Sequence, residues 1–262
     1  MKKYKVAEDA KPQIYLLLIA TVITIALWFI PYADYLVYPI RLFVTFVHEG
    51  SHVLAALLTG GAVESMTVSP DASGLVTFRY TNAFSQLITS SAGYLGTTAF
   101  GVLLLVSIRR AYSARIVLTA SAVFVGLMTL LFGLFAPLWN VFSANVSFGS
   151  LAFTVFSGTL LTVGLLAIAR YASARAAQFS LSFLAVQCVL NALSDLKTVF
   201  YASSPFASPM QTDALNMANA TGIPSLFWVL VWIGISVLMI SIGLRVYAVN
   251  QKGKQYDLPF ED

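Results

Sequence analysis

Charged residues are scarce in this sequence. Lys, Arg, Asp and Glu together make up 10% of its 262 residues, whereas hydrophobic residues make up 58%. Soluble domains carry roughly 25% charged residues, so a soluble fold would leave much of this apolar surface in water. Apolar segments near the roughly 20 residues needed to cross a bilayer recur along the whole chain. We therefore expect a multi-pass integral membrane protein, in the cytoplasmic membrane, with the lipid bilayer around it.

Cysteine is almost absent, because Cys188 is the only one. A single cysteine excludes an internal disulfide and a cysteine-based metal site. The net charge of +4 does not indicate nucleic-acid binding, since the basic residues lie in short clusters between apolar segments. The first apolar segment lacks a small-residue cleavage site, so we interpret it as a retained span.

About seven hydrophobic segments follow one another with short connections and without an internal repeat. Backbone in lipid must satisfy its own hydrogen bonds, so these segments are predicted to be helical. The predicted fold is an all-α polytopic membrane protein of about six or seven transmembrane helices, forming a single domain over residues 1–262. The segments cover roughly residues 13–31, 36–59, 83–108, 116–139, 148–169, 179–200 and 224–247, with a polar connection at about 201–223 and a C-terminal tail at about 250–262.

The basic clusters give two alternatives for the topology. Arginines after the third, fifth and seventh segments fall on one side if segments three to seven each cross once. Seven full crossings would place the N-terminal lysines on the opposite side, against the positive-inside tendency. Either the N-terminus is outside or an early segment does not cross. The second segment, which carries Arg41, is the candidate for an interrupted span.

One stretch, at about residues 61–80, departs from the helical pattern. After Gly60 and Gly61, β-branched residues flank the turn sequence Ser-Pro-Asp-Ala-Ser-Gly. This pattern predicts a β-hairpin. The hairpin either packs on the bundle as a simple loop or pairs through its edge strand with an extended peptide.

The second segment contains the HExxH motif of zinc hydrolases, at His48, Glu49 and His52. A helix places residues four apart on one face, so both imidazoles can point at one metal while Glu49 reaches a metal-bound water. These are the chain's only two histidines. Ionisable side chains inside an apolar span carry a large free-energy cost in the bilayer unless they pair with one another or bind a ligand. A polar cluster that only stabilises helix packing is the alternative interpretation.

A catalytic zinc site usually has three protein ligands, and without another histidine the third must be Asp or Glu. Asp195 is predicted, because it lies inside an apolar segment while most other acids lie in tails or connections. Asn191, one turn earlier, can hydrogen-bond a ligand, a water or a substrate carbonyl. The alternatives are an ion pair of Asp195 with Arg41 or Lys197, and Glu64 or Asp213 as the third ligand.

Small residues recur at four-residue spacing in the third segment, at Gly93, Thr97 and Gly101. Such spacing indicates close helix packing.

Together these features resemble the site-2-protease superfamily, in particular its compact bacterial-type branch. The resemblance rests on the HExxH helix, the Gly-Gly step into a hairpin, SAGYLG at residues 91–96, and the later Asn191 and Asp195. It spans roughly residues 40–225, including the stretch TDALNMANATGIP. It implies Zn²⁺ bound by His48, His52 and Asp195, Glu49 as general base and Asn191 assisting. Members of the superfamily cleave membrane-embedded or membrane-proximal segments of other proteins.

The leading hypothesis is thus a zinc-dependent intramembrane metalloprotease with a membrane-protein substrate and no nucleic-acid partner. One alternative is a transporter or proton or metal pathway that uses His48, His52 and Asp195. Another is a catalytically silent membrane scaffold. Glu49 discriminates between them, because neither alternative requires a Glu directly after the first of two histidines four apart.

Overall fold

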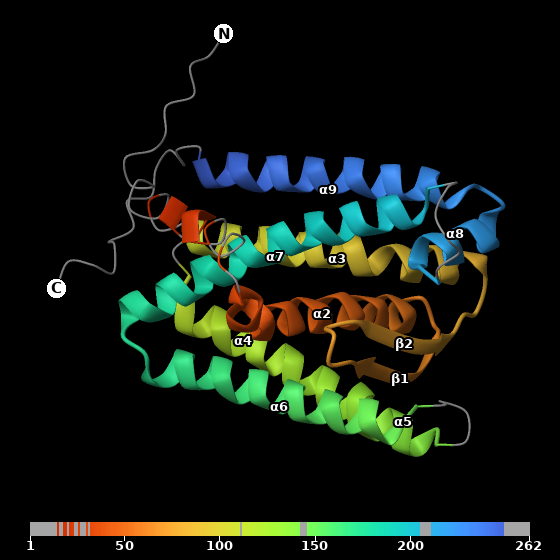
Figure 1. The fold of residues 1–262 in the computed structure, drawn as a ribbon, viewed down its shortest axis with the longest axis horizontal. Coiled ribbons are helices and arrows are strands. Elements are labelled where there is room, and N and C mark those ends of the chain that lie inside the picture. The colour runs from red at the N-terminus through yellow and green to blue at the C-terminus, as the bar shows by residue number, and fades with distance from the viewer. Residues whose placement is uncertain are drawn as a thin grey trace, which may run out of the picture.

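A computed structural model describes residues 32–110, 112–141, 146–204 and 211–248, with several further positions between residues 15 and 30. The long helices run side by side, and a two-stranded sheet and a short helix lie toward one end (Figure 1). The elements are α2 (Ala33–Leu58), β1 (Ala62–Val68), β2 (Gly74–Arg79), α3 (Ala83–Arg109), α4 (Ala114–Leu127), η2 (Met128–Phe135), α5 (Ala136–Trp139), α6 (Phe148–Tyr171), α7 (Ala174–Ala202), α8 (Asp213–Thr221) and α9 (Ser225–Ala248).

Five helices of the described chain are long and apolar enough to cross a membrane. They are α3, the continuous run Ala114–Trp139 formed by α4, η2 and α5, and then α6, α7 and α9. Their bounds agree with the third to seventh predicted segments to within a few residues. The predicted count of six or seven is not matched in these ranges. The first predicted segment lies largely outside the described residues, and α2 carries the polar motif in its interior.

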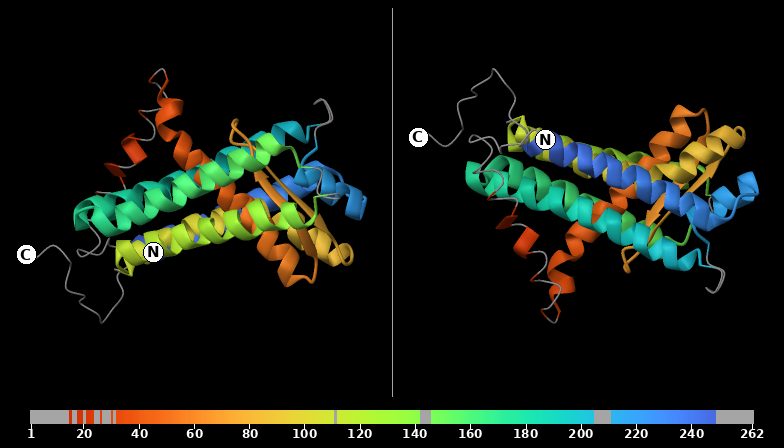
Figure 2. Two further views of the ribbon diagram at one scale, coloured as in Figure 1. Left: turned by 90° about the horizontal axis from the view of Figure 1, so that it is seen from below. Right: turned by 90° about the horizontal axis from the view of Figure 1, so that it is seen from above.

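Helix α2 differs from the other long helices in direction and composition. It crosses the bundle obliquely in both views of Figure 2. Pro39 lies inside its first half and cannot donate to the helical hydrogen-bond ladder. The second half is nevertheless well buried, with Phe46, Val47 and Val53 at 1% exposure or less. The motif is therefore held on a helix that buries one face against the rest of the bundle.

Helix α3 packs against α2, α7, α8 and α9. Its small residues make this possible, as the spacing predicted. A Cβ on Gly96 would come within 2.3 Å of Ser51 Oγ of α2, and one on Gly101 within 2.9 Å of Val189 of α7. Thr97, between them, is fully buried. At the centre of the bundle small residues take the place of large side chains, so the helix backbones approach one another closely.

The predicted hairpin is present, with β1 and β2 antiparallel. The predicted turn closes it, because Ser69 N–H donates to Ser73 O and the Asp71 carboxylate accepts from Ser73. Side chains of α2 bind the same turn: Tyr38 Oη donates to Pro70 O at 2.6 Å and Thr45 Oγ1 to Ala72 O at 2.7 Å. The hairpin is thus fixed along α2.

Arginines gather at the end of the bundle away from α8. They lie where α3, α6 and α9 end and where α4 and α7 begin (Figure 1): Arg109, Arg110, Arg115, Arg170, Arg175 and Arg245. By the positive-inside tendency we expect this end to face the cytoplasm.

Cysteine labelling in intact cells tests this orientation. We expect a membrane-impermeant maleimide to label Asn219→Cys, on the exposed side of α8, and to label Ala174→Cys only after permeabilisation. Cys188 is fully buried, so the wild-type protein provides the blank. The reverse pattern would mean that the charge asymmetry does not orient the bundle.

Candidate metal centre

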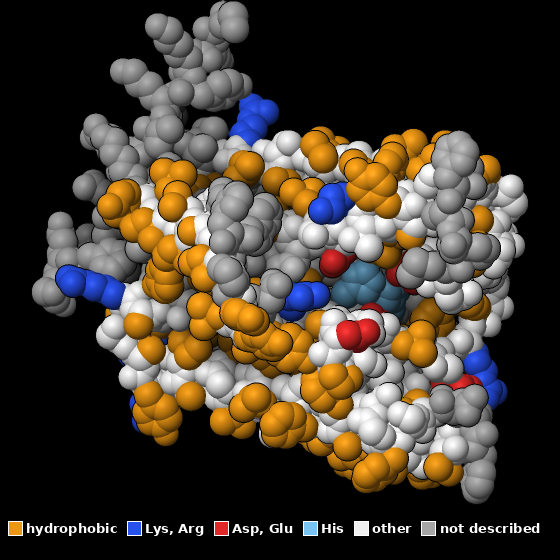
Figure 3. Space-filling model, in the orientation of Figure 1, with side chains coloured by type: hydrophobic (Ala, Val, Ile, Leu, Met, Phe, Trp, Pro, Cys, Tyr) orange, Lys and Arg blue, Asp and Glu red, His pale blue; other side chains and the backbone are white. Residues whose placement is uncertain are grey.

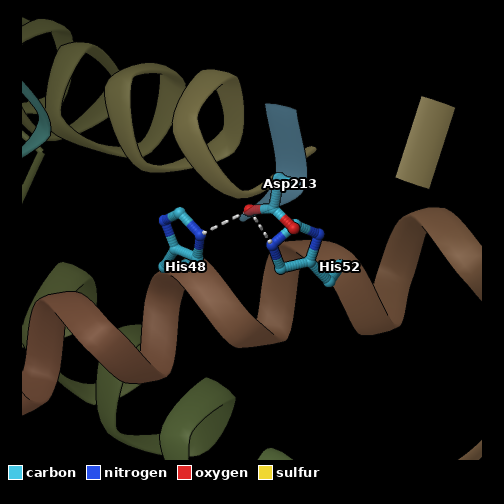
Figure 4. A group of neighbouring side chains, drawn as sticks. All are labelled: His48, His52 and Asp213. Carbon is cyan, nitrogen blue, oxygen red and sulfur yellow. Dashed lines mark ion pairs between the residues drawn. The ribbon is translucent and has the colours of Figure 1, made fainter. Parts of the chain in front are cut away.

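Three side chains from two separate elements converge in the interior. His48 and His52 lie one turn apart on α2, and Asp213 begins α8 (Figure 4). Asp213 Oδ2 is 3.5 Å from His48 Nε2 and 3.3 Å from His52 Nε2. The three candidate ligand atoms all lie within 4.8 Å of one another. This group could hold a metal ion.

The donor set and its spacing fit zinc. Two imidazole nitrogens and one carboxylate oxygen are typical of catalytic zinc sites, which keep a fourth position open. In a tetrahedral site with bonds of about 2.0–2.2 Å, two ligand atoms lie roughly 3.3–3.6 Å apart. Both distances from Asp213 Oδ2 to the imidazole nitrogens, 3.3 and 3.5 Å, fall in that range. Two of the three ligand–ligand distances therefore match a tetrahedral zinc site.

The second ring nitrogen of His52 fixes its orientation. Nδ1 lies 2.7 Å from the carbonyl oxygen of Thr89 in α3. A carbonyl can only accept, so Nδ1 carries a hydrogen, and Nε2, the ring atom nearest Asp213, is the nitrogen available to a metal ion. Hydrogen bonds of this kind orient metal-binding histidines and raise their basicity.

Gly93 of α3 leaves room for the imidazoles. A Cβ at this position would lie 2.2 Å from His48 Nε2 and 2.4 Å from His52 Nε2, the same two atoms that point at Asp213. No side chain fits there. Glycine thus brings the backbone of α3 directly against the two nitrogens that face Asp213.

Asp213 is positioned by the caps of α8. Thr212 Oγ1 accepts from Leu215 N–H at the start of the helix, and Gly222, with φ 72°, ends it. Asp213 thus lies in the first turn, where a negative charge is favoured. Burial by itself would raise the pKa of Asp213, but the adjacent imidazoles of His52 and His48 hold it well below its usual range. The carboxylate is therefore ionised, as a metal ligand must be.

Glu49 lies beside the group and against the hairpin. Its side chain is buried, and it interacts electrostatically with both histidines and Asp213. A Cβ on Gly74, the first residue of β2, would come within 2.4 Å of Glu49 Oε1. The hairpin therefore covers the Glu49 carboxylate with the backbone of Gly74, which has no side chain.

The centre is reached from one side of the bundle. Figure 3 shows histidine side chains in a hollow bordered by acidic side chains, on a face where hydrophobic side chains are widespread. The side chain of His48 is 14% exposed and that of His52 4%. This face runs parallel to the long helices.

The other predicted site residues are not part of this three-residue group. Asp195, on α7, interacts electrostatically with His48 and Arg41 but is not part of the three-residue group. The amide nitrogen of Asn191 donates within its own helix, to Gln187 O. Glu64, an alternative third ligand, forms an ion pair with Arg79 across the hairpin. The metal role of Asp195 and the catalytic role of Asn191 stay predictions.

The sequence around Asp213 contains a helix-capping pattern that could have pointed to this residue. A Thr-Asp start and a Gly-Ile-Pro end are typical of a short capped helix, here within the predicted polar connection. Such a pattern predicts that Asp213 is held in place. It does not predict which side chains it meets.

A comparison with protein families agrees with this centre. The sequence model of Peptidase M50B-like proteins matches residues 18–243. The chain belongs to this family. The predicted relation to site-2 proteases is thereby confirmed. No curated protein and no solved structure matches the chain.

Membership in the Peptidase M50B-like family implies a metalloprotease, and five apolar helices fit a multi-pass membrane protein. The motif on α2 lies inside the matched range, and so does Asp213. The metal-binding group and the family therefore indicate the same chemistry.

Proposed function

We propose that this protein is a zinc-dependent intramembrane metalloprotease that hydrolyses peptide bonds in or near transmembrane segments of other proteins. The observation that carries the proposal is the convergence of His48, His52 and Asp213 with Glu49 beside them. Family membership supports it. A transporter or scaffold would not need this buried carboxylate next to a metal-binding group.

His48, His52 and Asp213 are the proposed zinc ligands, with Asp213 in place of the predicted Asp195. The distances of 3.5 and 3.3 Å from Asp213 Oδ2 to the two imidazole nitrogens support this choice. When bound there, zinc would acidify a water molecule and polarise the peptide carbonyl.

Glu49 is the proposed general base. It takes a proton from the attacking water and returns it to the leaving amine nitrogen. Its burial against Gly74 removes competing water and holds the carboxylate next to the metal-binding group. The HExxH spacing places it on the correct face of α2.

The free edge of β2 is the proposed place for the substrate backbone. β1 packs against η2, α5 and α6, and Val68 N–H donates to Thr154 Oγ1 of α6. Among the residues that the structure describes, β2 pairs with β1 alone, and its first residue touches Glu49. An extended peptide added to this edge would lie beside the general base. A helical transmembrane segment must therefore unwind locally before it can be cut.

Replacement of Glu49 by glutamine tests the function. We expect Glu49→Gln to keep about one zinc per chain and to lose cleavage by about 10²–10⁴-fold, because general acid–base catalysis contributes that much. Candidate substrates are membrane proteins that accumulate uncut in cells expressing Glu49→Gln and appear as fragments with the wild type.

The matched control is Glu64→Gln, which removes another buried carboxylate but one already paired with Arg79. It should cleave normally. If purified wild type and Glu49→Gln process the same reconstituted membrane proteins equally, hydrolysis at this centre is wrong.

A further inference from the structure

Tyr94 lies at the metal-binding group but has no part in the function described so far. It follows Gly93 on α3, and its ring meets His48 edge to face, with centroids 4.8 Å apart and an interplanar angle of 87°. Its phenol is therefore a neighbour of a proposed zinc ligand. Phenylalanine would give the same aromatic packing, so the packing does not account for the hydroxyl group of Tyr94.

The ring is held firmly from a second direction. Tyr94 stacks on Trp232 of α9, with centroids 5.0 Å apart and an interplanar angle of 23°. Trp232 is 1% exposed, and its indole Nε1–H donates to Ser91 Oγ, one turn before Tyr94 on α3. A ring clamped between His48 and Trp232 keeps its hydroxyl in one place before any substrate arrives.

The hydroxyl lies close enough to the acidic groups of the site to interact with them electrostatically. Its partners in this interaction are the carboxylates of Asp213, Asp195 and Glu49. Within residues 32–110, 112–141, 146–204 and 211–248, no hydrogen bond joins the Tyr94 hydroxyl to another residue. A phenol is neutral at pH 7 and donates one hydrogen bond. A fixed donor beside the metal-binding group is thus available to a ligand.

We propose that Tyr94 is a further catalytic residue, whose hydroxyl donates a hydrogen bond to the carbonyl oxygen of the scissile peptide. This inference rests on the proposed proteolytic function and deepens it. Preorganised donors aimed at the oxygen on which charge develops are among the strongest contributions to peptide hydrolysis.

The step requires no extra reactant. The water oxygen bonds to the carbonyl carbon, the carbonyl π electrons move onto oxygen, and the water's proton passes to Glu49. The C–N bond then breaks as Glu49 gives that proton to nitrogen. Tyr94 keeps its proton throughout and only stabilises the negative charge on oxygen.

A structural role for Tyr94 predicts a different result. If the ring only supports His48, then Tyr94→Phe preserves the support, and any larger disturbance would also disturb the metal site. The test therefore needs a readout of the metal site and a separate readout of the hydrogen bond. Cobalt(II) in place of zinc provides the first, since its visible absorption reports the ligand set. Acetohydroxamic acid provides the second, since its metal-bound carbonyl oxygen resembles the polarised peptide oxygen.

We expect Tyr94→Phe to bind cobalt with the wild-type spectrum and to bind acetohydroxamic acid about tenfold more weakly or worse, because hydrogen bonds to charged groups carry that much free energy. On a substrate cut by the wild type, kcat should fall by about 10²–10³-fold with little change in KM. Tyr201→Phe, an exposed tyrosine on α7, is the matched control and should change neither quantity.

Unchanged acetohydroxamic acid binding in Tyr94→Phe would overturn the role of the hydroxyl while leaving the protease proposal intact. An altered cobalt spectrum that accounts for the weaker binding would assign Tyr94 a structural role instead. Absence of cobalt and zinc from the wild type would overturn the proposed function itself, and this inference with it.

Discussion

Asp213→Ala should purify with almost no zinc, whereas Asp195→Ala should purify with about one zinc per chain. Asp213 Oδ2 lies within 3.5 Å of both imidazole nitrogens, and Asp195 is outside that group. Loss of an outer-shell partner typically lowers metal affinity 10–100-fold, so loss of a direct ligand should lower it by more than about 100-fold. Elemental analysis of the detergent-purified variants, after dialysis against a weak chelator, measures the difference.

The two aspartates form a matched pair, because both are acids near the motif helix and each is replaced by the same residue. His52→Ala serves as the positive control for metal loss. Full zinc in Asp213→Ala together with loss in Asp195→Ala would show that Asp195 is the third ligand, as the sequence predicted. The protease function would survive that result with a different ligand set.

Gly93→Ala should abolish metal binding and cleavage while the protein still inserts as a bundle. The added methyl group would lie 2.2 and 2.4 Å from the two Nε2 atoms, far inside contact distance, so the imidazoles or α3 must move. Packed interiors do not absorb such a group without displacement of neighbours. Ligand atoms shifted by about 1 Å no longer match zinc distances. Zinc content and cleavage of a substrate identified with Glu49→Gln measure the effect.

Gly234→Ala on α9 is the control for this substitution. It introduces the same methyl group into a helix where no heavy atom lies within 4 Å of the new Cβ. It should retain zinc and activity, because Ala is a better helix former than Gly and the new methyl group meets no neighbour. Full zinc occupancy in Gly93→Ala would contradict the close contact between α3 and the imidazoles.

Helix boundaries were largely predictable from this sequence. Segments three to seven agree with α3, α4–α5, α6, α7 and α9 because in lipid the length of an apolar run is itself the physical constraint. The hairpin was predictable because its turn chemistry interrupts that pattern locally. The short helix α8 was missed as an element, since nine residues with a polar composition carry a weak signal.

The sequence by itself determined the membrane class, the hairpin, and the placement of His48, Glu49 and His52 on one helix. These depend on composition and on spacings of a few residues, which a helix converts directly into geometry. Only the tertiary structure decided that Asp213 joins the two imidazoles, that Gly93 makes room for them, and that the ring of Tyr94 packs against His48. Contacts between α2, α3 and α8 depend on how closely their backbones approach. These helices are far apart in the sequence, so no local sequence pattern predicts which of several acidic residues lies beside the two histidines.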